Sequence, residues 1–418
     1  MNIKQTFLSL KIRNFRLYFF GQALSLIGTW MQTIGQDWLV LKLTNSGTQL
    51  GIVSALQFLP ILFLGPWGGS ISDRFEKRKI LYFTQAASAI LALTLGILVA
   101  INQINIWAVY ALALALGFVT VVDSPARQTF VPEMVKKENM TNAITLNSTE
   151  VNVARALGPV VSGGIIAYVG LAPCFIINAV SYIPVIITLW MMNAKELNMA
   201  PRITAAKGRI KEGLAYVKSS PVLFYTLIMM AIIGMLSYEF SVALPLMAKF
   251  TFSGNAATYS ILIGASGFGS VLGGLYASGR RRINPGILIF SALMFGIALT
   301  IASFMPSVLL TAVAMFFAGI FSVNFLSLSS ALLQTESVPE MRGRVMGLWS
   351  VAFLGTTPIG APIIGVIGEY VGPRWALATG GIAAIIGAWV GAWGLMRKNK
   401  PLKTSSIEAV AEESTKIP

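Results

Sequence analysis

The sequence contains no histidine and one cysteine, Cys174. Without histidine there can be no Ser-His-Asp triad, no His-ligated zinc and no histidine proton relay. A single cysteine forms no intrachain disulfide, and the apolar surroundings of Cys174 are typical of an inert buried thiol. The sequence therefore predicts no metal site and no cofactor. Any proton transfer must use carboxylates.

Charged residues are also scarce, at 11% of 418 residues, whereas hydrophobic residues make up 55%. The mean hydropathy of +0.73 is far from that of soluble proteins. The first apolar run, near residues 15–41, is long enough to span a bilayer and longer than the apolar region of a signal peptide. We expect an integral membrane protein whose first segment is not cleaved.

Twelve apolar segments have the length of a membrane-spanning helix, since about 20 residues cross about 30 Å of hydrocarbon. The predicted fold class is an all-α membrane protein with twelve transmembrane helices, and an even number of spans places both termini on one side. The expected helices lie near residues 15–41, 48–72, 80–101, 105–124, 142–169, 172–192, 222–248, 257–279, 285–305, 307–333, 344–369 and 374–396.

Lysine and arginine are distributed unevenly over the segments that connect these helices. If both termini are cytoplasmic, 27 of the 31 cations lie in inner segments, Arg155 lies within a helix, and only Lys42, Lys249 and Arg374 lie outside. This asymmetry predicts cytoplasmic termini, because cytoplasmic loops carry the excess of positive charge. The net charge of +15 then reflects topology and attraction to anionic lipid, and no nucleic-acid partner is expected.

Short sequences recur at nearly one spacing. VPEM occurs twice, 207 residues apart, YVG occurs twice, 202 residues apart, and Gly69 before a basic turn corresponds to Gly274 before Arg280–Arg282, 205 residues apart. These repeats predict two parallel six-helix bundles with a binding site at their interface. We expect an N-terminal bundle over 1–192, a cytoplasmic linker with an amphipathic helix over 193–221, a C-terminal bundle over 222–396 and a disordered cytoplasmic tail over 397–418.

The turn after the second apolar segment, GGSISDRFEKRKI, joins Gly69 to Asp73, Arg74 and a cluster of cations. It resembles the loop signature of the major facilitator superfamily. Three further segments, DSPARQTFVPEMV, ARALGPVVSGG and VPEMRGRVMGL, resemble the branch that includes the enterobactin exporter and macrolide efflux proteins. This resemblance implies proton-driven export of a small amphiphilic molecule across a bacterial inner membrane. Antiporters of the superfamily usually have glycine where this chain has Ser162.

Two acidic residues lie within expected helices at the repeat spacing. Asp37 and Glu239 are 202 residues apart, in the similar contexts IGQDWLV and LSYEFSV. The helices that carry them line the central cavity in proteins that this chain resembles. We expect the pair to include a proton acceptor, since a desolvated carboxyl can load and unload a proton near neutral pH. The alternative is that both side chains are solvated near the outer helix ends and act only as gating residues, without binding protons or substrate.

Arg155, with Glu150 and Asn152, forms a second polar cluster within the membrane. A charge at the bilayer centre is costly and is tolerated mainly beside a partner or a cavity. One interpretation is that Arg155 binds an anionic substrate or favours the charged form of a nearby carboxylate. The other is a buried ion pair, with Asp37 for example, that fixes how the helices pack.

The turn at Asp73 is expected to act as a conformational latch. Asp73 lies at the inner face, where the N-terminus of the expected helix 344–369 arrives if the halves close inside, and the helix dipole favours a carboxylate there. Such a contact would stabilise the outward-facing state. The expected latch also includes Gly69, Arg74, Arg78, Asp123 and Arg127. Arg74 or Arg78 is expected to pair with Asp123, and Arg127 is expected to bridge to Glu133 or Glu150. Lys77 and Lys79 are expected only to orient the chain and contact lipid.

Two smaller expectations complete the site. Gly158 and Pro159 are expected to break or bend the helix over 142–169. Trp30 and Trp38, with Gln32 and Gln36, either pack and anchor the helix or line a pocket for an amphiphile.

Among functions, export of a drug or siderophore by proton antiport and alternating access comes first. A transporter of lipid or lysophospholipid with the same fold is the alternative. A membrane-embedded enzyme is remote, because no nucleophile, base and orienting group come together. The expected partners are a small-molecule substrate, protons and membrane lipid, and the protein is expected to be a monomer.

Overall fold

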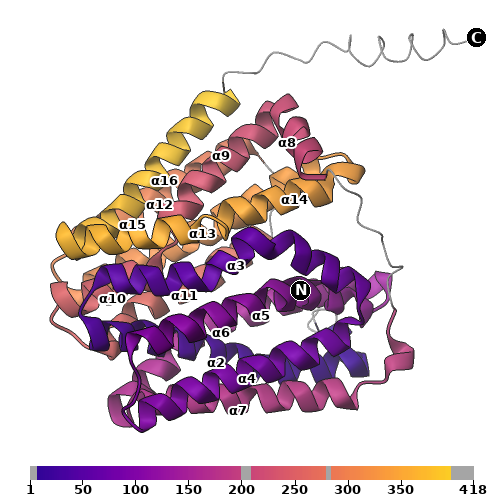
Figure 1. The fold of residues 1–418 in the computed structure, drawn as a ribbon. Helices are drawn as coiled ribbons and strands as arrows, with labels where there is room; N and C mark the ends of the chain where they lie inside the picture. Colours follow the sequence, from indigo (N-terminus) through magenta and orange to yellow (C-terminus); the bar gives the residue numbers. More distant parts are fainter. Residues whose placement is uncertain (1–6, 199–208, 279–283, 397–418) are drawn as a thin grey trace, which may run out of the picture.

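A computed structural model describes residues 7–198, 209–278 and 284–396, which form helices joined by short turns and contain no strand (Figure 1). Arg280–Arg282 and the expected tail lie outside these residues. The N-terminal half contains η1 (Leu8–Lys11), α2 (Arg13–Thr44), α3 (Gly47–Arg74), α4 (Lys77–Ala100), α5 (Ile106–Glu133), η2 (Lys137–Asn139), α6 (Met140–Tyr168), α7 (Ala172–Met191) and η3 (Ala194–Glu196). The C-terminal half contains α8 (Arg209–Ser219), α9 (Pro221–Leu236), α10 (Phe240–Leu246), η4 (Met247–Thr251), α11 (Ala256–Ser278), α12 (Pro285–Phe304), α13 (Val308–Glu336), α14 (Pro339–Phe353), α15 (Thr357–Tyr370) and α16 (Pro373–Met396).

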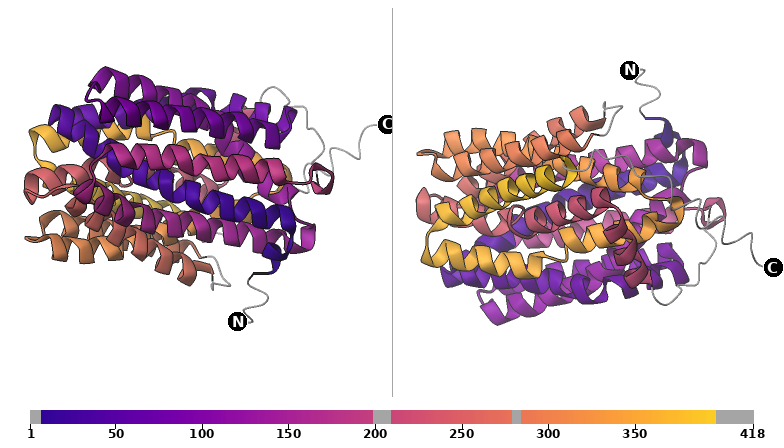
Figure 2. Two further views of the ribbon diagram at one scale, coloured as in Figure 1. Left: turned by 90° about the horizontal axis from the view of Figure 1, so that it is seen from below. Right: turned by 90° about the horizontal axis from the view of Figure 1, so that it is seen from above.

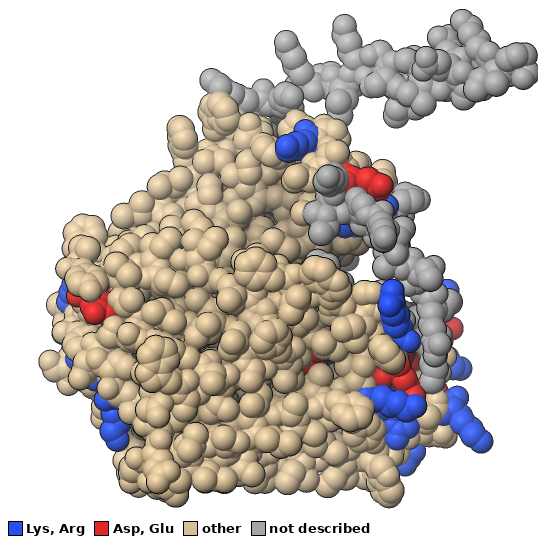
Figure 3. Space-filling view, viewed as in Figure 1, with Lys and Arg blue, Asp and Glu red and all other residues tan. Residues whose placement is uncertain are grey.

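The helices have the length and composition of membrane spans. Eleven segments of the described residues are long and apolar enough to cross a bilayer. The 32-residue α2 runs beside them and is more polar, because it buries Gln22, Gln32, Gln36 and Asp37. On the face that Figure 3 shows, charged side chains gather toward the two ends of the helices and leave an apolar band between. This is a multi-pass membrane protein.

The helices form the two predicted bundles. In the N-terminal bundle α2 packs on α6 and α7, and α4 packs on α5 and α7; in the C-terminal bundle α12 packs on α13 and α16, and α9 packs on α16. The bundles meet along two pairs of helices, α3 with α15 and α6 with α11 (Figure 2). The interface expected to hold the binding site therefore runs between these pairs.

Two expected continuous helices are in fact broken. The expected helix over 222–248 is interrupted at residues 237–239, and the expected helix over 344–369 begins earlier and is interrupted at residues 354–356. Polar side chains stabilise the first break: Ser237 Oγ donates to the carbonyl of Gly380 at 2.6 Å, and Tyr238 Oη donates to the carbonyl of Ser322 at 2.8 Å. Long apolar runs flank both breaks, so each interrupted segment still has the mean hydropathy of one continuous span.

The expectation that Gly158 and Pro159 break the helix is wrong, whereas a bend there stays a prediction. The helix α6 continues through both residues. A Cβ atom on Gly158 would collide with Trp30 of α2, so this glycine allows α2 and α6 to pack closely. A proline inside a membrane helix is tolerated when neighbouring groups satisfy the freed carbonyl.

The bundles touch at one end and separate at the other. On α3, a Cβ atom on Gly47 or Gly51 would collide with backbone carbonyls of α15, at 2.6 Å from Gly365 and 2.5 Å from Ala361. Farther along α3, a Cβ atom on Gly69 would meet nothing within 4 Å. In Figure 1, α3 lies against α15 at one end and α14 rises away from α3 at the other. The closed end carries the few cations expected outside, so we name it the outer end, and the open end the inner end.

Candidate transport site

A buried hydrogen bond joins the two bundles near the outer end. Tyr259 Oη on α11 donates to Asp37 Oδ2 on α2 at 2.7 Å. Asp37 is 4% exposed and Tyr259 is fully buried. The alternative interpretation, a solvated Asp37, is therefore wrong. The carboxyl lies in the interface between the bundles, which we call the seam. Its surroundings must therefore change when the outer end opens.

Two charged side chains of the C-terminal bundle contact helix ends of the N-terminal bundle. Glu369 Oε2 accepts hydrogen bonds from Ser46 Oγ at 2.6 Å and from the backbone N–H of Thr48 at 2.8 Å, at the start of α3. Lys249 Nζ donates to the carbonyl of Leu41 at 2.8 Å and to Asn45 Oδ1 at 2.6 Å, at the end of α2. Each charge complements the dipole of the helix end that it meets. We call these contacts the outer clamp.

The outer clamp was not predicted from the sequence. Lys249 is one of only three cations expected outside, and Glu369 is an acidic residue near an outer helix end. The small number of charged residues near the outer helix ends was the sequence feature that could have pointed to these two residues. Their partners are a hydroxyl, a side-chain amide and backbone groups of the other bundle, which carry no charge pattern that a sequence could show.

Glu239 lies at the break between α9 and α10. Its backbone carbonyl accepts from the N–H of Ala243 at 3.0 Å, so it caps α10. The side chain is 4% exposed and lies beside the hydroxyl of Thr357, at the start of α15. Its Oε1 is buried without a hydrogen-bond partner among the described residues. The alternative of a solvated Glu239 is also wrong, and the repeat partners Asp37 and Glu239 face different surroundings.

The breaks of the two interrupted spans pack against each other. A Cβ atom on Gly234, near the end of α9, would approach the carbonyl of Ala352 to 2.7 Å, and one on Gly360 of α15 would collide with the carbonyl of Met235. Discontinuous helices at mid-membrane are typical of transporter binding sites. Glu239 therefore lies where two half-helices can be reoriented.

Arg155 of α6 makes no ion pair with any described residue. Its guanidinium lies over the ring of Trp30, with 5.0 Å from Cζ to the ring centroid. Asp37, its expected partner, hydrogen-bonds Tyr259 instead. Both carboxyl oxygens of Glu150 are buried without a hydrogen-bond partner among the described residues. The expected buried ion pair is thus not formed in this conformation.

Among the other residues expected to line a cavity, Gln32 has a side chain that contacts a helix of its own bundle. Its Oε1 accepts from Asn178 Nδ2 on α7 at 2.7 Å. Gln36 is buried, and Trp38 packs against the main apolar core. Trp30 contacts a charged group, the guanidinium of Arg155.

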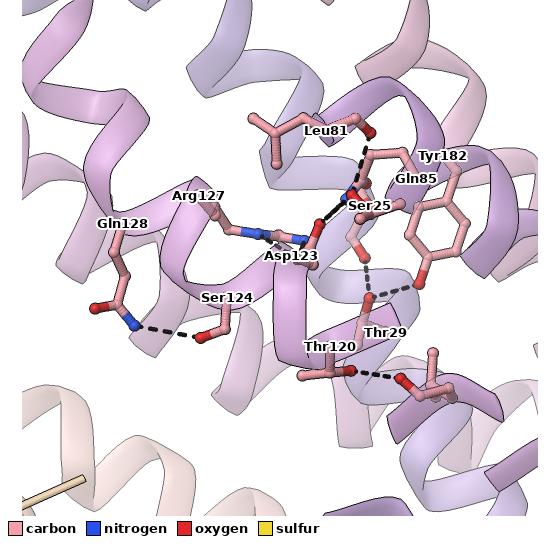
Figure 4. Close-up of polar contacts among 12 residues, drawn as sticks. Ser25, Thr29, Leu81, Gln85, Thr120, Asp123, Ser124, Arg127, Gln128 and Tyr182 are labelled. Carbon is pink, nitrogen blue, oxygen red and sulfur yellow. Dashed lines mark hydrogen bonds and ion pairs between the residues drawn. The ribbon is translucent and has the colours of Figure 1, made fainter. Parts of the chain in front are cut away.

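The expected latch pairing between Arg78 and Asp123 is wrong. Asp123 Oδ2 accepts from Arg127 Nη2 at 2.6 Å, one turn away on α5, and Oδ1 accepts from Thr84 Oγ1 at 2.6 Å and Gln85 Nε2 at 2.9 Å on α4 (Figure 4). These donors occupy both carboxylate oxygens. Arg127 is correspondingly engaged by Asp123 and does not bridge to Glu133 or Glu150.

The cations of the inner turn have structural partners. Arg78 donates from Nε to the carbonyl of Leu189 at 2.7 Å and from Nη2 to that of Trp190 at 3.1 Å, which caps the C-terminal end of α7. Lys77 forms an ion pair with Glu133, so the expectation that it only contacts lipid is wrong. Arg74 is exposed. The side chain of Asp73 lies outside the described part of the structure, so its role as a latch stays a prediction.

Within the described ranges, no three His, Cys, Asp or Glu side chains come close enough together to hold a metal ion. The fold and the seam instead define a transporter: two six-helix bundles, closed on one side, with isolated charges buried between and within them.

Comparisons with known proteins place the chain in a family. The family model described as "Transmembrane secretion effector" matches residues 4–416, so the chain belongs to this family of the major facilitator superfamily. It is 24% identical to the staphyloferrin A transporter of Staphylococcus aureus (strain NCTC 8325 / PS 47), over 88% of this chain and 93% of that protein. It is also 24% identical to the enterobactin exporter EntS of Escherichia coli O1:K1 / APEC, over 89% of each chain.

Solved structures share the fold. A bacterial homologue of the human lysosomal transporter Spinster, in an inward-facing and unoccupied conformation, has a TM-score of 0.71 at 13% identity, covering 96% of this chain and all of that one. A mutant of the nucleoside transporter NupG has a TM-score of 0.72 at 15% identity, covering 93% of this chain and 99% of that one. The predicted superfamily and fold are confirmed, and the protein is a transporter, not an enzyme.

Proposed function

We propose that the protein exports a small amphiphilic molecule, of the siderophore or drug type, from the cytoplasm across a bacterial inner membrane, by alternating access and proton antiport. Two relatives that match along most of its length are a staphyloferrin A transporter and an enterobactin exporter. The distribution of cations supports cytoplasmic termini. With that orientation the open end faces the cytoplasm, from which an exporter must take its substrate.

The single observation that carries proton coupling is the hydrogen bond between Tyr259 and Asp37 across the bundles. In the closed outer seam, Asp37 is buried against a hydroxyl. Opening the outer end separates α2 from α11 and brings water to the carboxyl. The proton affinity of Asp37 therefore differs between the two conformations, and by linkage its protonation biases the conformational equilibrium. Proton antiport requires such a difference.

Everted membrane vesicles with an acidified interior and a pH-sensitive dye test this proposal. The compounds to be tested are macrolides, catecholate siderophores and lysolipids. Adding one that is transported should release protons from wild-type vesicles. Asp37→Asn should abolish proton release, whereas Glu138→Gln, at an exposed carboxyl near the inner end, should leave it intact. Undiminished proton-coupled export by Asp37→Asn would remove this residue from the mechanism. A response to lysolipids alone would favour the lipid transporter.

A further inference from the structure

A positive charge lies over an aromatic ring near the middle of the protein. Arg155 lies midway along α6, Trp30 lies near the middle of α2, and Tyr238 lies in the break after α9. The guanidinium is over the indole ring of Trp30. Helix α11 of the other bundle also approaches Arg155, because a Cβ atom on Gly267 would lie 3.1 Å from the carbonyl oxygen of Arg155. Elements of both bundles thus lie beside this residue at mid-membrane.

Within the described part of the structure, this cation has no negative partner. Its Nε is buried with no hydrogen-bond partner among the described residues, and no described ion pair includes Arg155. The Tyr238 hydroxyl donates to the carbonyl of Ser322, so it is a neutral phenol and supplies no charge. An unpaired charge at this depth costs at least a few kcal/mol. A chain that keeps one here is expected to use it with an anion from elsewhere.

The geometry selects the kind of anion. The indole of Trp30 covers one face of the guanidinium, which leaves the N–H groups along its edge for hydrogen bonding. A planar carboxylate matches that edge with two parallel hydrogen bonds. Trp30 is only partly buried, as is Arg155, so both side chains keep surface that a bound molecule can touch. An apolar or aromatic group beside the carboxylate would pack against the ring.

We propose that Arg155 and Trp30 form a subsite that binds a carboxylate of the transported molecule, with an adjacent ring or apolar group against Trp30. This deepens the proposed function and rests on it, because it names the chemical class of the substrate. The other account is that Arg155 is held for Glu150 or Asp37 in another conformation. In that case removing Arg155 changes conformational balance but not carboxylate binding.

Two small probes separate these accounts. Salicylate carries a ring and a carboxylate, and salicylamide carries the same ring with an uncharged amide. With the full chain in lipid nanodiscs, saturation-transfer NMR should show salicylate binding at least about tenfold tighter than salicylamide, as expected for a charge-assisted hydrogen bond. Arg155→Gln should weaken salicylate binding about tenfold or more. Arg155→Lys, which keeps the charge but not the planar edge, should give an intermediate loss.

Controls make the result specific. Arg16→Gln removes the same charge from an exposed position on the helix that carries Trp30, and should leave salicylate binding unchanged. Trp30→Phe should weaken it severalfold. Equal binding of the two probes by the wild type, no binding of either, or wild-type salicylate affinity in Arg155→Gln would overturn the proposal. If Arg155→Gln fails to fold, the wild-type comparison and Trp30→Phe decide.

The subsite and the proton-coupled export can fail separately. Binding is measured at equilibrium without a proton gradient, so in the Asp37→Asn background salicylate binding should still depend on Arg155, even though this variant no longer couples export to protons. Coupled export together with salicylate binding that ignores Arg155 would reject the subsite alone. Arg155-dependent binding without coupled export would reject the antiport alone.

Discussion

Ser46 and Glu369, from opposite bundles, meet at the outer end of the protein, where the hydroxyl of Ser46 donates to the carboxylate at 2.6 Å. The same carboxylate accepts from the backbone N–H of Thr48, so it lies at the positive end of α3. Lys249 meets the negative end of α2 in the complementary way. The closed outer end is therefore held by charges on helix ends, which can separate without leaving an unpaired charge in the membrane.

Removing one charge of the outer clamp should shift the protein toward the outward-open state. Glu369→Gln weakens the contact with the start of α3 by about 1 kcal/mol, or about fivefold in population, since the site is exposed. Gln103 and Leu309 are exposed near the outer end, one in each bundle. Spin labels attached to Gln103→Cys and Leu309→Cys report the distance between the bundles by double electron–electron resonance. Cys174→Ser makes the background free of other thiols.

The matched control for this measurement is Glu138→Gln, which removes an exposed carboxylate at the inner end. It should leave the outer distances unchanged. Distances in Glu369→Gln that coincide with those of the wild type would show that the outer clamp does not stabilise the closed end.

A side chain at Gly51 should prevent the outer end from closing. A Cβ atom there would lie 2.5 Å from the carbonyl oxygen of Ala361 and 2.8 Å from Cα of Pro362, which are backbone atoms that cannot move aside easily. Gly51→Ala should therefore widen the same outer distance. Gly65→Ala, on the same helix but with nothing within 4 Å of the added atom, is the control. A closed outer end in Gly51→Ala would contradict the close packing of α3 on α15.

The ion pair between Lys77 and Glu133 should stabilise the inner end of the N-terminal bundle. Their side chains are 11% and 8% exposed. Removing one partner of a buried pair leaves the other charge uncompensated and typically costs about 3 kcal/mol. Glu133→Gln should thus lower the melting temperature of the purified protein by several degrees, and Glu138→Gln should not. The double variant Glu133→Gln with Lys77→Met should recover part of the loss.

Much of the fold could be predicted because membrane helices must satisfy their backbone internally and must be apolar. The repeats at nearly one spacing predicted two bundles, and the same spacing singled out Asp37 and Glu239, which are both buried. The breaks at residues 237–239 and 354–356 were missed because each is short and lies between apolar runs that together have the length of one span. The pairing of side chains was harder to predict. Arg127, one helical turn from Asp123, donates to its carboxylate, and Arg78 donates to backbone carbonyls instead.

The direct test of alternating access driven by protonation is the pH dependence of the outer separation between Gln103→Cys and Leu309→Cys, with Asp37 intact and with Asp37→Asn. If Asp37 in the seam couples protonation to opening, the distance distribution of the intact protein shifts with pH and that of Asp37→Asn does not. The same pH-dependent shift in both proteins would contradict the role assigned to Asp37 and its hydrogen bond with Tyr259.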